Sequence, residues 1–273
     1  MVEERYIIPK IKAGLGNQIF IIAGCYAIQN SKKECNIQVL LPDEQDNIHR
    51  ISIYDYYNTL FTHFPNMDRI NIPNHVITNM YILPNYQNPT SYAFGEWIPS
   101  EIKIPCFLEG YFQYYPAIEP YIHDIQKILR FGLQNVILPF RPEERSVLIH
   151  VRRGDYVKFQ HYHYLIDEEY YLKALQYFDS SLTYYIFSDD IELCKTFNVF
   201  NKLENKIFVD EPDEIVALAL MTQCTGGAII ANSTFSYWGA MLGAYYYGKQ
   251  VIAPLKWCKD PPISLFPSDW KIL

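Results

Sequence analysis

Ser146-Val-Leu-Ile-His-Val-Arg-Arg-Gly-Asp-Tyr156 is the stretch that decides the fold of the second half of this chain. Its first six residues form a mostly apolar run, which is typical of a strand covered on both faces in a parallel sheet. Arg152 and Arg153 follow where that strand ends, and packing alone does not explain two adjacent arginines. Ligands bind outside the carboxyl ends of strands in open α/β sheets, and guanidinium groups suit phosphate. The stretch therefore predicts an anion site.

Four more apolar runs follow, and helical segments separate them. We expect these helices to end near residues 178, 197, 224 and 247, with Asp167 capping the first and Pro212 opening the third. The alternation predicts an α/β architecture, a doubly wound parallel sheet with helices on both faces. The five expected strands are 146–151, 182–187, 206–210, 227–231 and 250–253.

Polar side chains gather directly after three of these strands, at His150 to Asp155, Ser188 to Asp190 and Asn232 to Ser236. Because the carboxyl ends of parallel strands lie along one edge of the sheet, we expect the three clusters to converge on one ligand.

A nucleoside diphosphate accounts for all three clusters. Arg152 or Arg153 can neutralise a phosphate, and the helix N-terminus after Asn232 can hold its oxygens. Asp189 or Asp190 can accept hydrogen bonds from a ribose hydroxyl or from the N–H edge of guanine.

Each cluster also has a structural explanation. Asp189 and Asp190 can cap the helix that follows them, as Ser233 and Thr234 can cap theirs. The arginines can form a structural ion pair with Asp155 or with a neighbouring carboxylate. His161 and His163 have the spacing of metal ligands, but no third ligand is evident and we interpret them as loop residues.

The first half is less regular. Gly14-Leu-Gly-Asn-Gln18 lies between an expected strand over 6–11 and an apolar helix over 19–28, where glycines allow a tight turn before free helix N–H groups. Ile19 stands where a dinucleotide fingerprint needs its third glycine, which disfavours a nicotinamide site. An ordinary strand–helix turn remains open. We further expect strands over 36–41 and 107–113 and a helix over 121–131.

Net charge, cysteine content and the length of apolar runs argue against several classes of protein. A net charge of −7 argues against a nucleic-acid binder. Six single cysteines fit reduced thiols better than disulfides or a zinc site. The N-terminus lacks a signal peptide's apolar region, and no run approaches the roughly 20 apolar residues of a membrane span. We therefore expect a cytoplasmic protein of 273 residues with no transmembrane segment.

With these motifs in place, the chain resembles the inverting α-1,2-fucosyltransferases, glycosyltransferase family eleven. Two departures are Ala13, where a second glycine is usual, and Tyr237, where tryptophan is usual. The motifs that carry the resemblance are Gly14 to Gln18, Leu108 to Gln113, His150 to Tyr156, Tyr170-Tyr171, Phe187 to Asp190, Asn232 to Ser236 with Trp238-Gly239, and Phe266 to Trp270.

The resemblance implies an α/β fold of GT-B type, in which two Rossmann-like halves face a central cleft. We expect an acceptor-side domain over 1–143, a GDP-fucose-binding domain over 144–258, and a C-terminal segment, 259–273, that packs back toward the first domain. The implied reaction moves L-fucose from GDP-β-L-fucose to the 2-hydroxyl of a terminal galactose, with inversion. No metal and no cofactor are implied, since GDP-fucose is a substrate.

The resemblance also implies roles for single residues. Arg152, Asn17 and Asp155 are the expected catalytic residues: Arg152 contacts the β-phosphate, and Asp155 orients the arginine pair. Arg153 is either a second phosphate contact or a structural partner of an acid. The catalytic base is open among Asp155, Glu109 and a Tyr or His of the loop 156–164. Tyr111, Gln113 and Tyr156 are expected to bind the acceptor. The expected donor-binding residues are His150, Arg153, Gly14, Gly16, Ser188, Asp189, Asp190, Asn232, Ser233, Thr234, Phe235 and Ser236.

Two alternatives to this function stay open. One is a fucosyltransferase of another linkage or acceptor, α-1,6 or protein, and the other is an inactive protein that binds a sugar nucleotide. The expected partners are GDP-fucose and a galactose-containing glycan, with no nucleic acid. Peripheral association with a membrane-linked glycan also stays open.

Overall fold

The structure is a computed structural model that describes residues 5–32, 36–42, 53–70, 96–259 and 264–273. The chain divides into two compact units. The first contains Met1–Gly132 and Pro262–Pro267, and the second contains Leu133–Pro261 and Ser268–Leu273. The expected domain boundary at 143/144 thus falls inside the second unit. It followed the onset of the apolar strand at Ser146, whereas residues 136–145 before it are irregular and already belong to the second unit.

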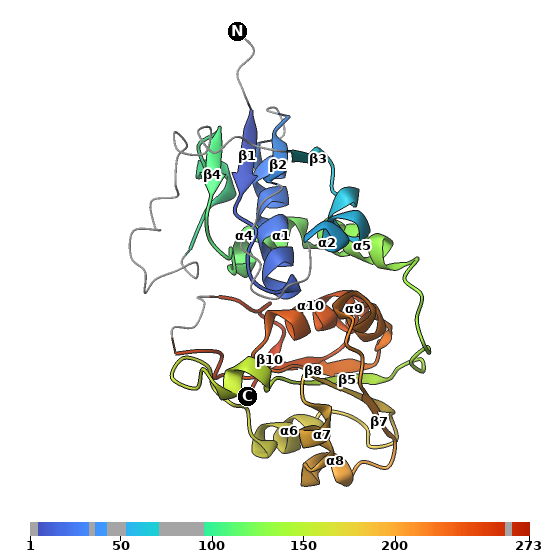
Figure 1. The fold of residues 1–273 in the computed structure, drawn as a ribbon. Coiled ribbons are helices and arrows are strands. Elements are labelled where there is room, and N and C mark those ends of the chain that lie inside the picture. The colour runs from blue at the N-terminus through green and yellow to red at the C-terminus, as the bar shows by residue number, and fades with distance from the viewer. Residues whose placement is uncertain (1–4, 33–35, 43–52, 71–95, 260–263) are drawn as a thin grey trace. The chain divides into compact units, whose positions relative to one another are not determined.

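The first unit is built on a four-stranded parallel sheet in the order β3-β2-β1-β4 (Figure 1). Helix α1, Leu15–Ser31, is buried along nearly its whole length because its sequence is apolar on all sides. The strands are β1 (Tyr6–Pro9), β2 (Gln38–Pro42), β3 (Met67–Ile70) and β4 (Cys106–Leu108), and the further helices are α2 (Ile53–Thr59), α4 (Tyr115–Ile118) and α5 (Ile122–Leu133).

The second unit holds a six-stranded parallel sheet in the order β10-β9-β8-β5-β6-β7. Its strands are β5 (Val147–Val151), β6 (Tyr184–Ser188), β7 (Lys206–Val209), β8 (Gly227–Ile229), β9 (Val251–Ala253) and β10 (Lys271–Ile272). Its helices are α6 (Glu168–Leu175), α7 (Ile191–Lys195), α8 (Asn198–Asn201), α9 (Glu214–Gln223) and α10 (Thr234–Leu242).

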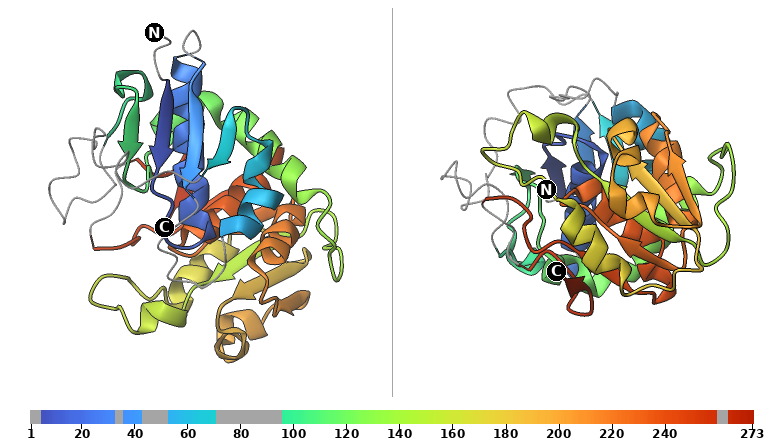
Figure 2. Two further views of the ribbon diagram at one scale, coloured as in Figure 1. Left: turned by 45° about the horizontal axis from the view of Figure 1, so that its top comes forward. Right: turned by 90° about the horizontal axis from the view of Figure 1, so that it is seen from below.

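Helices cover both faces of this second sheet. In Figure 1, α9 and α10 lie on one face and α6, α7 and α8 on the other, and Figure 2 shows the latter group from below. Side chains alternate along β5, so Val147, Ile149 and Val151 join the core beside α6 and α8. His150 consequently faces the opposite side, where its ring lies 6.1 Å from that of Phe235 on α10.

The predicted fold class is confirmed: the protein is α/β, of GT-B type, with a parallel sheet in each half and a doubly wound sheet in the second. All five predicted strands of that half are present. Helix α10 ends at Leu242 instead of near 247, with Gly243 as its C-cap residue in a non-helical conformation.

The C-terminal segment 259–273, expected to pack toward the first domain, divides between the units. Ser264 accepts a hydrogen bond from the Tyr115 N–H at 3.0 Å within the first unit. Lys271 and Ile272 instead form β10, which pairs with β9 in the second unit.

No helix in the described part of the chain combines the length and apolar character needed to cross a bilayer.

Candidate active site

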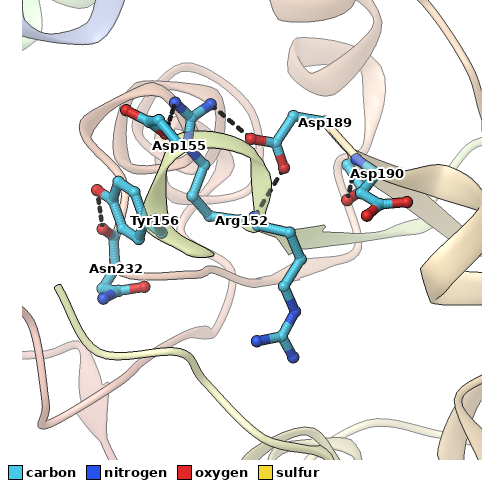
Figure 3. A network of polar contacts seen from close by, with 8 residues as sticks. Arg152, Asp155, Tyr156, Asp189, Asp190 and Asn232 are labelled. Atoms are coloured by element: carbon cyan, nitrogen blue, oxygen red, sulfur yellow. Dashed lines mark hydrogen bonds and ion pairs between the residues drawn. The ribbon is translucent and has the colours of Figure 1, made fainter. Parts of the chain in front are cut away.

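The strand order of the second sheet sets the position of the site. From β5 the chain continues to β6 on one side, and it later returns to β8 on the other side. Ligands of doubly wound folds bind at such a switch point, outside the carboxyl ends of the two strands. Arg152 directly follows β5, and Asn232 follows β8 by three residues. The Tyr156 hydroxyl bridges the two strand ends, donating to the Asn232 carbonyl at 2.9 Å (Figure 3).

Two carboxylates hold the Arg152 guanidinium (Figure 3). Nη2 donates to Asp155 Oδ1 at 2.7 Å, and Nη1 lies 3.0 Å from Asp189 Oδ2. Burial disfavours the charged guanidinium, but Asp189 and Asp155 outweigh that effect, so the pKa of Arg152 lies above its ordinary value. Arg152 is therefore a fixed cation at the switch point, with a quarter of its side chain exposed.

Asp189 is fixed in place by the backbone beside it. Its Oδ1 accepts a hydrogen bond from the Arg153 N–H at 2.7 Å, while its Oδ2 faces Arg152. Gly154 packs so closely that a Cβ there would overlap the Asp189 carboxylate. The glycine of the Arg-Arg-Gly-Asp sequence is thus required by the aspartate that follows the neighbouring strand β6.

Arg153 has a different role from Arg152. Its side chain is buried, donates to the Ile166 carbonyl at 2.6 Å and lies over the Phe197 ring at 5.3 Å. Of the two roles left open for it, the structure favours the structural one, although a backbone carbonyl takes the place of the expected acid.

Tyr156 is packed against charged and aromatic neighbours. Its ring stacks on the His163 imidazole at 3.8 Å with an interplanar angle of 8°, and the Arg152 guanidinium lies 5.3 Å from its centre. Burial raises the pKa of the Tyr156 hydroxyl, which remains protonated and donates to the Asn232 carbonyl. Tyr156, which was expected to bind the acceptor, thus lies over the Arg152 guanidinium, and its hydroxyl is engaged with a backbone carbonyl.

Asn232 fastens three chain segments together. Its Nδ2 donates to the carbonyls of Tyr164 at 2.9 Å and Trp257 at 2.7 Å, and its own carbonyl accepts from Tyr156. The side chain is buried. Asn232 therefore orders the loop around Arg152, and its Oδ1 has no partner among the described residues.

The start of α10 offers free backbone donors. Ser233 precedes the helix, and its side chain makes no capping hydrogen bond. The Ser236 hydroxyl is used internally, donating to the carbonyls of Ala231 and Ser233. Thr234 and Phe235 are half-buried in the first turn, where backbone N–H groups can hold phosphate oxygens.

The His150 ring lies near this turn, 6.1 Å from the ring of Phe235. Burial, and the charge of Arg152 as a lesser cause, lower the pKa of its imidazole to about 3, so the ring is neutral. Its Nδ1 has no hydrogen-bond partner within the described ranges. A neutral imidazole can donate or accept at a nucleoside.

Ser188 and Asp190 serve the local backbone. Ser188 Oγ accepts from the Asp190 N–H at 2.9 Å, and Asp190 caps α7 by accepting from the Leu193 N–H at 3.1 Å. Asp190 thus caps a helix, which was the structural explanation considered for it. Asp189 is brought to Arg152. The sequence pointed only to Asp155 or an unspecified neighbouring carboxylate, although the adjacency of β5 and β6 could have indicated Asp189.

In the first unit, a second set of polar residues surrounds the ends of β1 and β4. Gln113, which is buried, donates to Asn17 Oδ1 at 2.7 Å. Lys12 lies 4.7 Å from the centre of the Tyr111 ring, and Glu109 pairs with Lys10 at 3.0 Å. The structure thus groups Asn17 with Gln113 and Tyr111 with Lys12. The lysines were missed, although two lysines just after a strand were a visible signal.

The turn before α1 contains Ala13, which stands where the resembling family usually has a second glycine. Gly14 is the N-cap residue of α1, with Gly16 inside the first turn. Ala13 has a φ of 63°, a left-handed conformation that favours glycine. The Gln18 side chain donates to the Ala13 carbonyl at 2.8 Å and braces this turn.

Within the described ranges, no three His, Cys, Asp or Glu side chains are grouped so that they could hold a metal ion. The five cysteines that the structure describes are buried.

The chain is similar to several glycosyltransferases. An α-1,2-colitosyltransferase of Escherichia coli is 27% identical, with 97% of each protein covered. The O-antigen biosynthesis glycosyltransferase WbnK of Escherichia coli is also 27% identical, over 90% of this chain and 93% of the relative.

Two solved structures share little sequence with this chain. The α-1,6-fucosyltransferase NodZ soaked with GDP-fucose is 12% identical with a TM-score of 0.45, covering 88% of this chain and 93% of its own. A variant of Arabidopsis thaliana FUT1 with GDP is 13% identical with a TM-score of 0.48, covering 92% and 70%.

The decisive comparison is with a whole family. The profile described as glycosyl transferase family 11 matches residues 7–270, a range that includes the glycine turn, the arginine pair and the α10 start. This protein therefore belongs to glycosyltransferase family 11.

Proposed function

We propose that this glycosyltransferase moves L-fucose from GDP-β-L-fucose to the 2-hydroxyl of a terminal galactose on a glycan, with inversion and without a metal ion. The observation that carries the proposal is the fixed Arg152 cation beside the free N-terminus of α10 at the switch point of the second sheet.

The proposed transfer reaction requires positive charge next to the β-phosphate of the departing GDP. The acceptor hydroxyl attacks C1 of fucose opposite to the departing GDP, so the β linkage becomes α. Negative charge grows on the β-phosphate as the bond breaks, and preorganised donors that meet it are each worth about 3 to 4 kcal/mol, or about 10² to 10³ in rate. Arg152 and the backbone N–H groups of Thr234 and Phe235 are the donors proposed for this role.

Asn17 of the first unit is proposed to approach the sugar phosphate, with Gln113 fixing its side chain. The neutral His150 is proposed to contact the nucleoside. Tyr111 and Lys12 are proposed to meet the acceptor, since an aromatic ring can stack on a sugar face.

The test is a transfer assay with GDP-fucose and a galactose-terminated oligosaccharide in EDTA, which follows GDP release and determines the linkage formed. Inhibition by EDTA contradicts the metal-free mechanism. Arg152→Ala should abolish transfer, and Arg152→Lys should rescue it poorly because an ammonium cannot make the forked contact. Near-normal transfer by Arg152→Lys at saturating donor would count against the role of Arg152.

A second candidate, colitosyl transfer, is favoured by the name of one similar protein. Supplying nucleotide-activated colitose and GDP-fucose in parallel separates the two donors. Fucosyl transfer to another position identifies a different linkage, and GDP binding without turnover on any acceptor identifies an inactive binding protein.

A further inference from the structure

Two loops beside the site expose apolar side chains next to lysines. Val157 and Phe159, in the loop after Arg152, are 48% and 49% exposed. Leu255, just after β9, is 73% exposed. Lys158 lies between Val157 and Phe159, Lys256 follows Leu255, and Lys259 comes three residues later; all three lysines are exposed. We call these six residues the basic–apolar edge.

The two loops form one continuous part of the second unit. His163 and Cys258 form an antiparallel bridge, and the Lys259 N–H donates to the Tyr162 carbonyl at 3.0 Å. Asn232 binds the carbonyls of Tyr164 and Trp257 and so ties both loops to the end of β8. In Figure 1 the two loops run along the same side of the second unit. The edge is therefore anchored to the same residues that position Arg152.

The charge of this edge is opposite to that of the chain as a whole, which carries −7. None of its three lysines forms a salt bridge with a residue in the described ranges, and the Lys256 amine lies 5.9 Å from the Tyr164 ring. The one carboxylate of the first loop, Asp155, is bound to Arg152. The lysines are thus available to an external anion.

The combination of lysines with exposed apolar side chains indicates which kind of partner this edge binds. Lysines alone suit any polyanion, but exposed aliphatic side chains such as Val157 and Leu255 gain little from a sugar or from nucleic-acid phosphates. Apolar side chains that enter the acyl boundary while neighbouring lysines meet anionic headgroups are the pattern of interfacial membrane binding. From this pattern we infer that the basic–apolar edge docks the protein on an anionic phospholipid surface. Docking there holds the switch-point site close to the membrane.

The test uses the full-length protein and sedimentation with two kinds of vesicle, phosphatidylcholine alone and phosphatidylcholine mixed with phosphatidylglycerol. We expect binding to the mixed vesicles only, weakened by high salt because the lysines contribute through screened charge. Each lysine replaced by glutamate should cost at least fivefold in the partition coefficient. Lys158→Glu with Lys256→Glu should therefore lower binding at least 25-fold, and Phe159→Ser with Leu255→Ser should lower it about tenfold.

Matched controls come from the same unit. Leu172 on α6 is 51% exposed, and Lys202 after α8 is exposed, so Leu172→Ser with Lys202→Glu makes one change of each kind away from the edge. This control should bind like the parent protein. Equal binding to both vesicles, no binding to either, or equal losses in the control and edge variants would overturn the inference.

A transfer assay with a soluble acceptor separates this inference from the proposed function. Edge variants that lose vesicle binding should keep their KM for a soluble acceptor. Variants that raise that KM without changing vesicle binding would instead place the edge in the acceptor site and refute membrane docking. Failure of fucosyl transfer in the parent protein leaves the vesicle measurement fully interpretable.

Discussion

Replacing Asp155 by asparagine should tighten the binding of GDP, whereas the same change at Asp189 should weaken transfer. Both carboxylates hold Arg152, but they differ in how firmly they are held themselves. Asp189 also accepts the Arg153 N–H and is enclosed by Gly154, whereas 40% of the Asp155 side chain is exposed. A phosphate oxygen can therefore displace Asp155 from the edge of the Arg152 guanidinium that it contacts.

The charges give the size of the effect. Arg152 with two carboxylates has a net negative charge, which repels a diphosphate. Two unit charges about 4 Å apart interact by about 4 kcal/mol at an effective dielectric constant of 20. Because Asp155 is substantially exposed, solvent screening reduces this to about 1 kcal/mol. Asp155→Asn should therefore lower the Kd for GDP about fivefold.

Asp189→Asn has the opposite sign. The new amide can still accept the Arg153 N–H, but its NH2 group then faces the Arg152 guanidinium, donor against donor. Hydrogen bonds to charged groups contribute about 1.5 to 3 kcal/mol, so kcat/KM should fall about 10- to 150-fold. The unfolding free energy should fall by a similar amount.

The assay is titration calorimetry of GDP, combined with kcat and KM for transfer. Asp213→Asn is the matched control, since this carboxylate caps α9 and makes no contact with Arg152. A Kd for GDP that stays unchanged or rises in Asp155→Asn would refute the reasoning and make Asp155 solely an orienting residue.

Three other changes have defined outcomes. Gly154→Ala should displace Asp189 and reduce kcat/KM at least as much as Asp189→Asn, with parental kinetics as the contradicting result. Ala13→Gly should raise the unfolding free energy by about 0.5 to 1 kcal/mol in a urea titration, because it relieves the left-handed backbone; a loss of stability would contradict this. Because the pKa of His150 is lowered to about 3, the unfolded chain binds a proton that the folded chain rejects as the pH falls below about 6.5. Stability should then drop by up to about 1.4 kcal/mol per pH unit, and His150→Gln should flatten that slope in urea titrations at several pH values.

The sequence was most informative where burial on both faces forces an apolar run. Strands β5 to β9 were predicted to within about two residues for this reason. Strand β3, Met-Asp-Arg-Ile, carries two charges and gave no such signal, and β10 is only two residues long. Both exist because a neighbouring strand supplies their hydrogen bonds, which no local pattern reveals.

Contacts between side chains were harder to predict than the elements that carry them. The motifs correctly indicated that residues after the ends of β5, β6 and β8 lie together. The sequence alone could not separate the carboxylate that meets Arg152 from the one that caps α7, since Asp189 and Asp190 are adjacent and chemically identical. Strand twist and side-chain direction decide that assignment.

The hydrogen bonds of Asn232 have a consequence for folding during synthesis. The loop that holds Arg152 follows β5, yet its hydrogen bonds reach Asn232 and, through that residue, the Trp257 carbonyl about a hundred residues later. During synthesis, Arg152 leaves the ribosome long before these partners exist. The nascent chain can therefore pair Arg152 with Asp155 and Asp189 before Asn232 exists, but the loop around Arg152 gains its remaining anchors only after Trp257 has been translated.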